Sequence, residues 1–114
     1  MAIAELYSGS ETVSTTEHSL TTDTAGPDVD TTDAVIQVWL DLSALVKADV
    51  YQFRIYEKVT SGGTQRVVYE VRFANAQTEP IWVSPTLIVM HGWDATLDKI
   101  SGADAAITWS IRSV

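Results

Sequence analysis

The 114 residues, 46% of them hydrophobic, are enough for one domain with a modest core, in which folding buries roughly two-thirds of the area of the unfolded chain. The chain contains no cysteine, which excludes disulfides, thiolate zinc sites and a cysteine nucleophile. Seven basic and fifteen acidic residues give a net charge of -8. This argues against nucleic acid and anionic membranes as partners, because phosphate recognition requires a concentrated positive field.

The first part of the chain, residues 1–33, is rich in Ser, Thr, Asp, Gly and Glu and is weakly patterned. We predict one or two short strands near 3–8 and 11–16, followed by a mobile acidic loop over 23–33. The chain is therefore divided into a polar, partly flexible N-terminal segment and a β-sandwich body over residues 34–114. No basic stretch followed by an apolar block opens the sequence, so we expect a product made in the cytoplasm.

A run rich in β-branched and aromatic residues, AVIQVWLDL, begins at Ala34. Alternate positions form a uniformly apolar face that we expect to point to the core: Ile36, Val38, Leu40 and Leu42. The opposite face carries Val35, Gln37, Trp39 and Asp41. The next stretch, SALVKAD, is predicted to be a connecting turn, because a single helical turn is too short for an independent helix.

The most regular pattern predicts a long central hairpin, with strands over about 50–59 and 65–75 joined by a glycine pair. A turn centred on Gly62 pairs apolar positions across the strands, namely 51 with 73, 53 with 71 and 55 with 69. The same register sets Arg54 opposite Glu70, although only the apolar positions were used to choose it. A shift by one residue would destroy both matches.

Two interrupted segments follow the hairpin. In IWVSPTLIVMHG, residues 81–92, Pro85 cannot donate a ladder hydrogen bond, so we predict two short strands hinged there. The next stretch, WDATLDKISGAD, is predicted to hold at most one helical turn, with Asp94 as its cap and Gly102 at its end.

The chain closes on AAITWSIRSV, in which Ile107, Trp109 and Ile111 alternate with polar residues and predict a final strand. Six to eight short strands, turn signals between them and no convincing long helix predict an all-β fold. We expect a single antiparallel β-sandwich or jelly-roll-like domain, with a small barrel as an alternative.

Candidate catalytic groups are few. His18 and His91 are the only histidines, and His91 precedes GWD, so a His/Asp pair with Ser84 or Ser110 as the nucleophile can be drawn. No serine lies in a nucleophile-elbow sequence such as G-x-S-x-G, and the SGG at 61–63 is explained by the hairpin turn. We therefore predict no catalytic residue and no enzyme.

The acidic loop offers oxygen ligands at Asp28, Asp30 and Asp33 that could collect Ca²⁺. The loop lacks the sixth-position Gly and the twelfth-position Glu of an EF-hand, and solvated acidic loops are common. No glycine loop of the phosphate-binding type is present either. We predict no metal site and no cofactor.

Two of the four tryptophans are candidates for recognition. Trp39 lies on the more polar face of its strand and Trp82 lies among prolines, so either could be exposed for a sugar ring or a protein neighbour. Trp93 and Trp109 are expected in the core. The candidate interaction surface comprises Trp39, Trp82, Asp28, Asp30 and Asp33.

Two stretches resemble a known group of proteins. VWLDLSALVKADVYQFRIYEKVTSGGTQRVVYEVRF and HGWDATLDKISGADAAITWSIRSV are similar to small virion structural proteins of tailed bacteriophages, taken to be head decoration (cement) proteins. The resemblance covers about residues 34–114, and its most specific parts are IYEKVTSGGTQ and the terminal ITWSIR. These are fold signatures, so no binding or catalytic residue is carried over.

The resemblance implies a capsid decoration protein on the virion surface, made in the host cytoplasm, that stabilises the shell through protein contacts. Its partners would be the major capsid protein or other virion subunits, and it would form a homo-oligomer, a trimer or a dimer. The alternative is a carbohydrate- or receptor-binding β-sandwich module of a tail or fibre, with Trp39 or Trp82 as a stacking platform. A small enzyme would require a pocket that holds His91 with a carboxylate and a hydroxyl.

Overall fold

In the computed structural model, which describes residues 2–114, the chain forms ten strands and no helix. The strands are β1 (Ala4–Val13), β2 (His18–Ser19), β3 (Thr24–Ala25), β4 (Ala34–Asp41), β5 (Val50–Glu57), β6 (Arg66–Ala74), β7 (Ile81–Val83), β8 (Leu87–Val89), β9 (Asp94–Ser101) and β10 (Ala105–Ser113). With no helix among the described residues, none is present that could cross a membrane.

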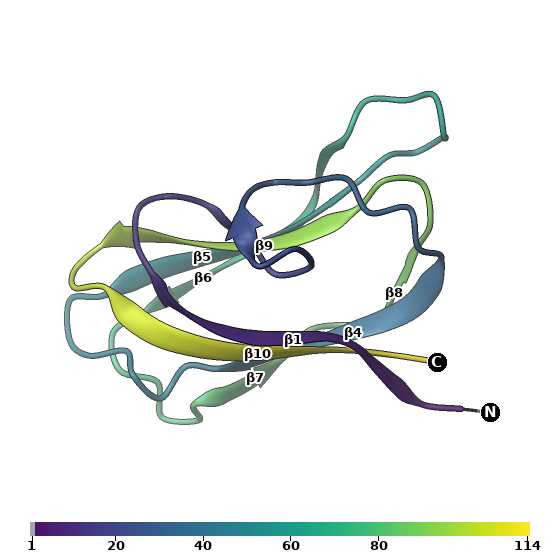
Figure 1. The fold of residues 1–114 in the computed structure, drawn as a ribbon. Coiled ribbons are helices and arrows are strands. Elements are labelled where there is room, and N and C mark those ends of the chain that lie inside the picture. The colour runs from purple at the N-terminus through teal and green to yellow at the C-terminus, as the bar shows by residue number, and fades with distance from the viewer. Residues whose placement is uncertain (1) are drawn as a thin grey trace.

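The strands form two five-stranded antiparallel sheets that lie face to face (Figure 1). Sheet A has the order β1-β10-β4-β7, with β8 also paired to β4, and sheet B has the order β3-β2-β9-β5-β6. One hydrophobic core, which includes Phe53 and Trp109, fills the space between them. The predicted all-β sandwich is confirmed.

The predicted core faces of β4 and β10 are confirmed. Ile36, Val38, Leu40 and Leu42 are each at most 1% exposed. Ile107, Trp109 and Ile111 of β10 are buried to the same extent. Full burial of one such aliphatic side chain contributes roughly 1.5–3 kcal/mol. Both strands are therefore fixed in register by the core side of sheet A.

The hairpin register predicted from the apolar positions is also confirmed. Tyr51 lies opposite Phe73 and Phe53 opposite Val71. Arg54 lies opposite Glu70, and its Nε is 3.7 Å from a Glu70 carboxylate oxygen. A bulge after Ile55 shifts the register by one residue at the turn end of the hairpin. Pro85 separates β7 from β8, and the SALVKAD stretch forms a turn, as expected.

Two local predictions are wrong. The stretch WDATLDKISGAD forms β9, an inner strand of sheet B between β2 and β5, and not a helical turn. Near the N-terminus, where one or two short strands were predicted, a single strand of ten residues, β1, pairs with β10 along its length. Both strands are specified by pairing with distant segments, which overrides their weak local pattern. The division into a flexible segment over 1–33 and a body over 34–114 stays a prediction.

Candidate functional site

The outer face of sheet A, which points away from sheet B, is apolar along β4, β7 and β8, whereas β10 carries Thr108, Ser110 and Arg112 there. Residues directly opposite each other in paired strands share a face. Trp39 lies opposite Val83, and Val35 opposite Ile88, so these side chains form one continuous surface. We call this surface the apolar face, and its members are Ile3, Val35, Trp39, Ile81, Val83, Ile88, Met90 and Val114.

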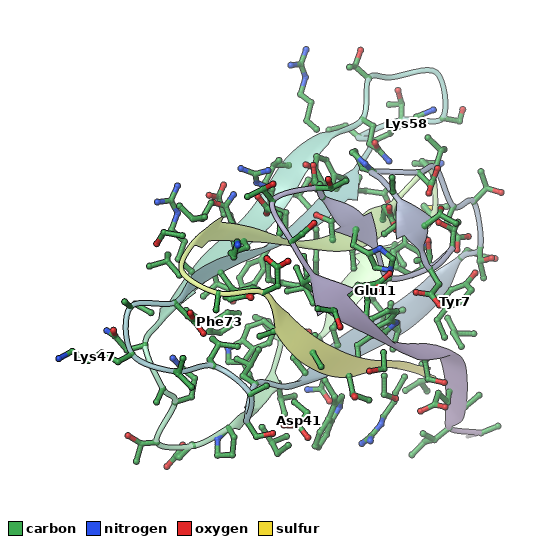
Figure 2. All side chains as sticks on the ribbon, turned by 60° about the vertical axis from the view of Figure 1, so that its left-hand side comes forward. Tyr7, Glu11, Asp41, Lys47, Lys58 and Phe73 are labelled. Carbon is green, nitrogen blue, oxygen red and sulfur yellow. The ribbon has the colours of Figure 1, made fainter. Side chains whose placement is uncertain are left out.

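Several of these side chains project into solvent. Ile88 is 78% exposed, Ile3 76%, and Ile81 52%. The outer face of an antiparallel sheet is ordinarily polar, because it faces water. A contiguous apolar patch on a sheet face is typical of a surface that binds another molecule. Asp41, at the end of β4, carries a charge at the margin of this face (Figure 2).

Trp39 lies at the centre of the apolar face. Its indole Nε1 donates a hydrogen bond to Gln37, and the Arg112 guanidinium carbon lies 4.1 Å from the ring centroid. An open hollow of about 290 Å³ lies beside it, lined in part by Val35, Trp39, Arg112 and Val114. The guanidinium already occupies one face of the ring as a cation–π partner. The surface thus combines an apolar depression with one fixed positive charge.

The outer face of sheet B is different, because it is polar and covered by the chain segment between β1 and β4. Glu17 of this segment accepts hydrogen bonds from the Tyr56 hydroxyl and from Thr96, the latter at 2.6 Å. Burial, and then the Glu17 carboxylate, raises the pKa of Tyr56 to about 12. Gln52 and Thr96 are fully buried on this face. We call it the polar face.

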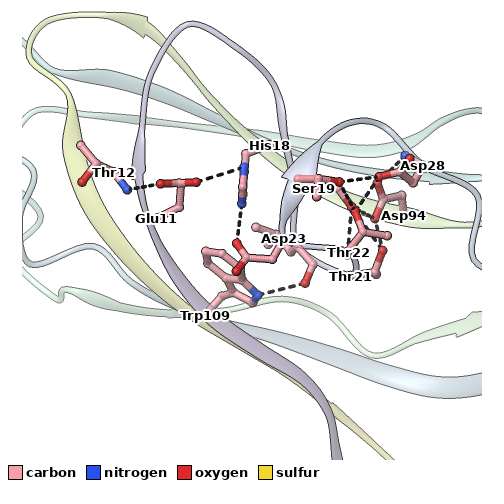
Figure 3. Close-up of polar contacts among 12 residues, drawn as sticks. Glu11, Thr12, His18, Ser19, Thr21, Thr22, Asp23, Asp28, Asp94 and Trp109 are labelled. Atoms are coloured by element: carbon pink, nitrogen blue, oxygen red, sulfur yellow. Dashed lines mark hydrogen bonds and ion pairs between the residues drawn. The ribbon is translucent and has the colours of Figure 1, made fainter.

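Asp94 anchors the covering segment (Figure 3). Its fully buried carboxylate accepts hydrogen bonds from the hydroxyls of Ser19, at 2.9 Å, and Thr21, at 2.8 Å. The backbone N–H groups of Asp28 and Ala95 donate to it at 2.7 and 2.9 Å. Burial raises the pKa of Asp94, and these hydrogen bonds act in the opposite direction. The carboxylate therefore holds the covering segment to β9 through hydrogen bonds.

A second polar cluster joins β1 to the same segment. His18 Nε2 is 2.8 Å from Asp23, and His18 Nδ1 is 3.6 Å from Glu11 (Figure 3). Within residues 2–114 this is the one group of three acidic or histidine side chains close enough to suggest a metal ion. The two carboxylates approach opposite nitrogens of the ring, so one ion could not bind all three without side-chain movement. The ring also packs edge-on against Trp109.

The structure separates the residues of the predicted interaction surface. Asp28 accepts a hydrogen bond from Thr22, and Asp30 accepts one from the Tyr7 hydroxyl. Asp33 lines a hollow at the end of the apolar face. The three aspartates therefore have different surroundings, and the absence of a metal site among them stays a prediction.

The two candidate tryptophans also differ in their surroundings. Trp39 is on the apolar face, whereas Trp82 points inward and its ring centroid is 5.2 Å from both Phe53 and Phe73. Sugar binding by either side chain stays a prediction. Trp93 and Trp109 are buried, as expected.

Most of the apolar face had no local signal in the sequence. Trp39 was singled out, and its strand face was identified correctly. Ile81, Ile88 and Arg112 were missed, because the pairing of β7, β8 and β10 with β4 is what brings them beside Trp39. Their alternation with inward-facing neighbours was the only clue, and it could not show which strands would be adjacent.

No protein-family model and no curated protein match the chain. Among solved structures, the chain is similar to one from Bacillus endospore appendages, which are described as a novel family of disulfide-linked pili. The TM-score is 0.52 at 12% sequence identity, over 99% of this chain and 87% of that one. It also resembles PirA, with a TM-score of 0.49 at 11% identity, over 94% and 92% of the two chains. At these identities the likeness to the appendage chain concerns the fold alone, and the likeness to PirA carries no argument.

These comparisons correct the identification made from the sequence. The chain is not supported as a bacteriophage head decoration protein, because its fold is similar to that of an appendage pilus chain. The capsid location, the virion partners and the tail or fibre alternative are withdrawn with it. The hairpin and terminal strand that carried the resemblance encode a sandwich core, and unrelated functions share such cores.

Proposed function

We propose that the protein is a structural subunit that assembles with other copies of the same chain, and that the apolar face is one contact surface. The observation that carries this proposal is the exposure of large apolar side chains on one sheet face, with Ile88 at 78% and Ile3 at 76%. Their transfer from water into an interface is favourable by roughly 25 cal/mol for each Å² buried. A second copy supplies the same kind of apolar surface.

The likeness to the appendage chain supports a polymer-forming role, since that protein forms pili. Those pili are described as disulfide-linked, whereas this chain has no cysteine. Its copies would therefore be held together by non-covalent contacts. The net charge of -8 opposes association, but salt screens such repulsion beyond about 8 Å at physiological ionic strength.

In this proposal the protein acts by binding and has no catalytic step. The ring nitrogens of His18 lie beside the carboxylates of Glu11 and Asp23. The backbone N–H of His91 donates to Glu57. Within the described part of the chain, no serine hydroxyl is hydrogen-bonded to an imidazole, the arrangement that a serine nucleophile needs.

The test is the dependence of molecular mass on protein concentration, measured by analytical ultracentrifugation. We expect the wild-type chain to self-associate and Ile88→Asp to weaken association at least tenfold, because the substitution buries a charge in the contact. Val59→Asp is the matched control, since Val59 is 94% exposed in the hairpin turn, outside the apolar face. A wild-type chain that is monomeric at every concentration, or equal effects of the two substitutions, would contradict the proposal.

A further inference from the structure

The core reaches the surface on one side of the sandwich, between the edges of the two sheets. Strand β6 is the edge of sheet B and β7 is the edge of sheet A. Trp82 of β7 contacts Phe73 of β6, with ring centroids 5.2 Å apart, and Tyr69 stacks on the same indole at 6.5 Å. Tyr69, Val71 and Trp82 pack against the core but are each only partly buried. Aromatic surface is therefore left in contact with water along this side.

The part of β6 beside this aromatic surface is regular. The bulge of the hairpin lies on β6, because Tyr69 and Val67 face successive residues of β5 and Val68 between them has no partner. Beyond the bulge, residues 69–74 pair one by one with β5. An added strand can form a continuous ladder with this stretch, whereas the bulge interrupts any ladder that extends further toward the hairpin turn.

One backbone hydrogen bond shows which residues of the stretch point to the free edge. The N–H of Asn75 donates to the carbonyl of Asp49 at 2.7 Å and so continues the ladder with β5. In an antiparallel pair, residues whose backbone groups face the partner alternate with residues whose groups face away. Counting back from Asn75, the N–H and C=O groups of Glu70 and Arg72 face away from β5. No strand of residues 2–114 lies beside them there.

The sequence of the stretch is self-complementary about Val71. Read in either direction from this valine, a charged residue comes first and an aromatic residue second, since Tyr69 and Glu70 precede it and Arg72 and Phe73 follow it. An antiparallel second copy therefore sets a base against each acid and an aromatic ring against each aromatic ring. Both charged residues are exposed, and 41% of the Glu70 side chain is accessible to solvent.

We infer that residues 69–74 pair with the same stretch of a second copy as antiparallel strands, about a twofold axis at Val71. The inference rests on the proposed self-assembly and names a contact besides the apolar face. Glu70 lies opposite Arg72 of the partner subunit, and the symmetry produces this pair twice. Each such pair exchanges two main-chain hydrogen bonds, because the backbone groups of both residues face the partner. Tyr69 lies opposite Phe73 of the partner subunit, so the aromatic surface is covered.

Other registers of the same edge fit less well. An axis at Glu70 or at Arg72 would set that charge against its own copy. An axis at Tyr69 would set Arg66 against Arg72 of the partner subunit and would place the bulge inside the contact. Axes between residues would set an edge-facing backbone group against one that faces β5. The axis at Val71 alone among these pairs opposite charges within the regular stretch.

The β6 contact lies on sheet B and the apolar face lies on sheet A, so the two contacts do not compete for the same residues. A single twofold contact closes as a dimer. A subunit that uses both surfaces binds two other copies, and assembly then continues beyond a pair.

The absence of cysteine from the chain allows a cross-linking test with Val71→Cys. Opposite Cα atoms of an antiparallel pair are about 4.5–5.5 Å apart, within the range that a disulfide spans. We expect a covalent dimer to form at least about tenfold faster under mild oxidation than with Val59→Cys, because pairing holds the two thiols at a high local concentration. Val59 is 94% exposed in the hairpin turn and Val71 is partly buried, so random collisions would favour the control. The readout is a time course on non-reducing gels, with thermal unfolding of both variants to verify that they are folded.

The register has its own test in the Val71→Cys background. Arg72→Glu sets carboxylates opposite each other and should slow cross-linking at least about threefold, and the further change Glu70→Arg should restore the rate. The same two changes in the cysteine-free chain should weaken and then restore self-association in the ultracentrifuge, which tests the register even if Val71→Cys does not fold. Failure of Glu70→Arg to restore either quantity would overturn the axis at Val71.

The outcomes separate this contact from the proposed function. Cross-linking of Val71→Cys that is no faster than that of Val59→Cys, in a protein whose wild-type chain self-associates, would overturn β6 pairing and leave the proposed function standing. A wild-type chain that is monomeric at every concentration would overturn both.

Discussion

The outer faces of the two sheets differ in whether another part of the chain covers them. On sheet B, polar side chains are covered by the segment between β1 and β4, and Asp94 and Glu17 connect the two through hydrogen bonds. On sheet A, Ile88 and Ile3 of the apolar face are exposed to solvent, and no segment of residues 2–114 covers them. The same sandwich therefore has one outer face that is covered by its own chain and one that is exposed to solvent.

This difference shows how buried polar residues distinguish a face that is covered by a loop from a face that binds another molecule. A face that is covered by a loop needs hydrogen-bond partners for the backbone of that loop, and the buried carboxylate of Asp94 supplies them. A face that binds another folded surface needs apolar area and few buried charges. Substitutions on the two faces should accordingly affect different properties.

The largest expected effect separates the two candidate tryptophans. Trp82→Ala should lower the free energy of unfolding by about 3 kcal/mol, because the ring packs against core aromatic side chains. Trp39→Ala should lower it by about 1 kcal/mol or less, the value of an exposed contact such as that with Arg112, but should weaken self-association. Urea denaturation of dilute samples measures the first quantity, and ultracentrifugation measures the second. Similar losses of stability in the two variants would mean that the distinction between the core side of sheet A and its apolar face is wrong.

The cover of the polar face should depend on Asp94. Asp94→Ala leaves the buried donors of Ser19 and Asp28 without their acceptor and should cost about 2 kcal/mol of unfolding free energy. Hydrogen exchange should increase in residues 18–30, while self-association remains unchanged.

The matched control for the Asp94 substitution is Asp104→Ala. Asp104 pairs with Lys99 at 2.6 Å, but its side chain is 47% exposed. An exposed ion pair of this kind contributes about 1 kcal/mol or less. Equal losses from the two aspartates would show that Asp94 does not anchor the segment.

The smallest expected effect concerns the ion pair between Arg54 and Glu70 on the polar face. Charge reversal by Arg54→Glu should lower the free energy of unfolding by about 0.2–1 kcal/mol. Adding Glu70→Arg should restore most of the loss that comes from the Arg54–Glu70 interaction. Part of the loss should remain, because Arg54 also lies 3.8 Å from Glu17. Chemical denaturation at low protein concentration gives both values. The absence of any recovery would argue that the observed cross-strand register does not couple these side chains.

The sequence predicted those elements in which apolar residues alternate on a half-buried surface. β4 and the hairpin belong to this class, because one face points to the core and the other does not. β9 was missed although Ala95 and Leu97 alternate with polar residues. Asp94 suggested a helix cap, yet Asp94 and Thr96 are both buried under a polar segment. When the outer face of a strand is both buried and polar, its polar residues no longer indicate exposure to solvent, so the pattern of a half-buried strand is harder to recognise.

The candidate site was less predictable than the fold for a related reason. The outward face of β4, with Val35 and Trp39, follows from alternation within one strand. The extension of that face to Ile88 and Arg112 follows from which strands lie beside β4, and long-range pairing decides this. The sequence therefore contained the centre of the apolar face but not its extent.

The position of β10 in sheet A has a consequence for the timing of folding during synthesis. β10 lies between β1 and β4, and Ala4 of β1 pairs with Ser113 near the other end of the chain. The ribosome releases β1 and β4 well before their common neighbour, so sheet A cannot close until residues 105–113 have emerged. Until then both strands have unpaired edges and exposed apolar residues, a state prone to aggregation. Pairings of such large sequence separation also form slowly.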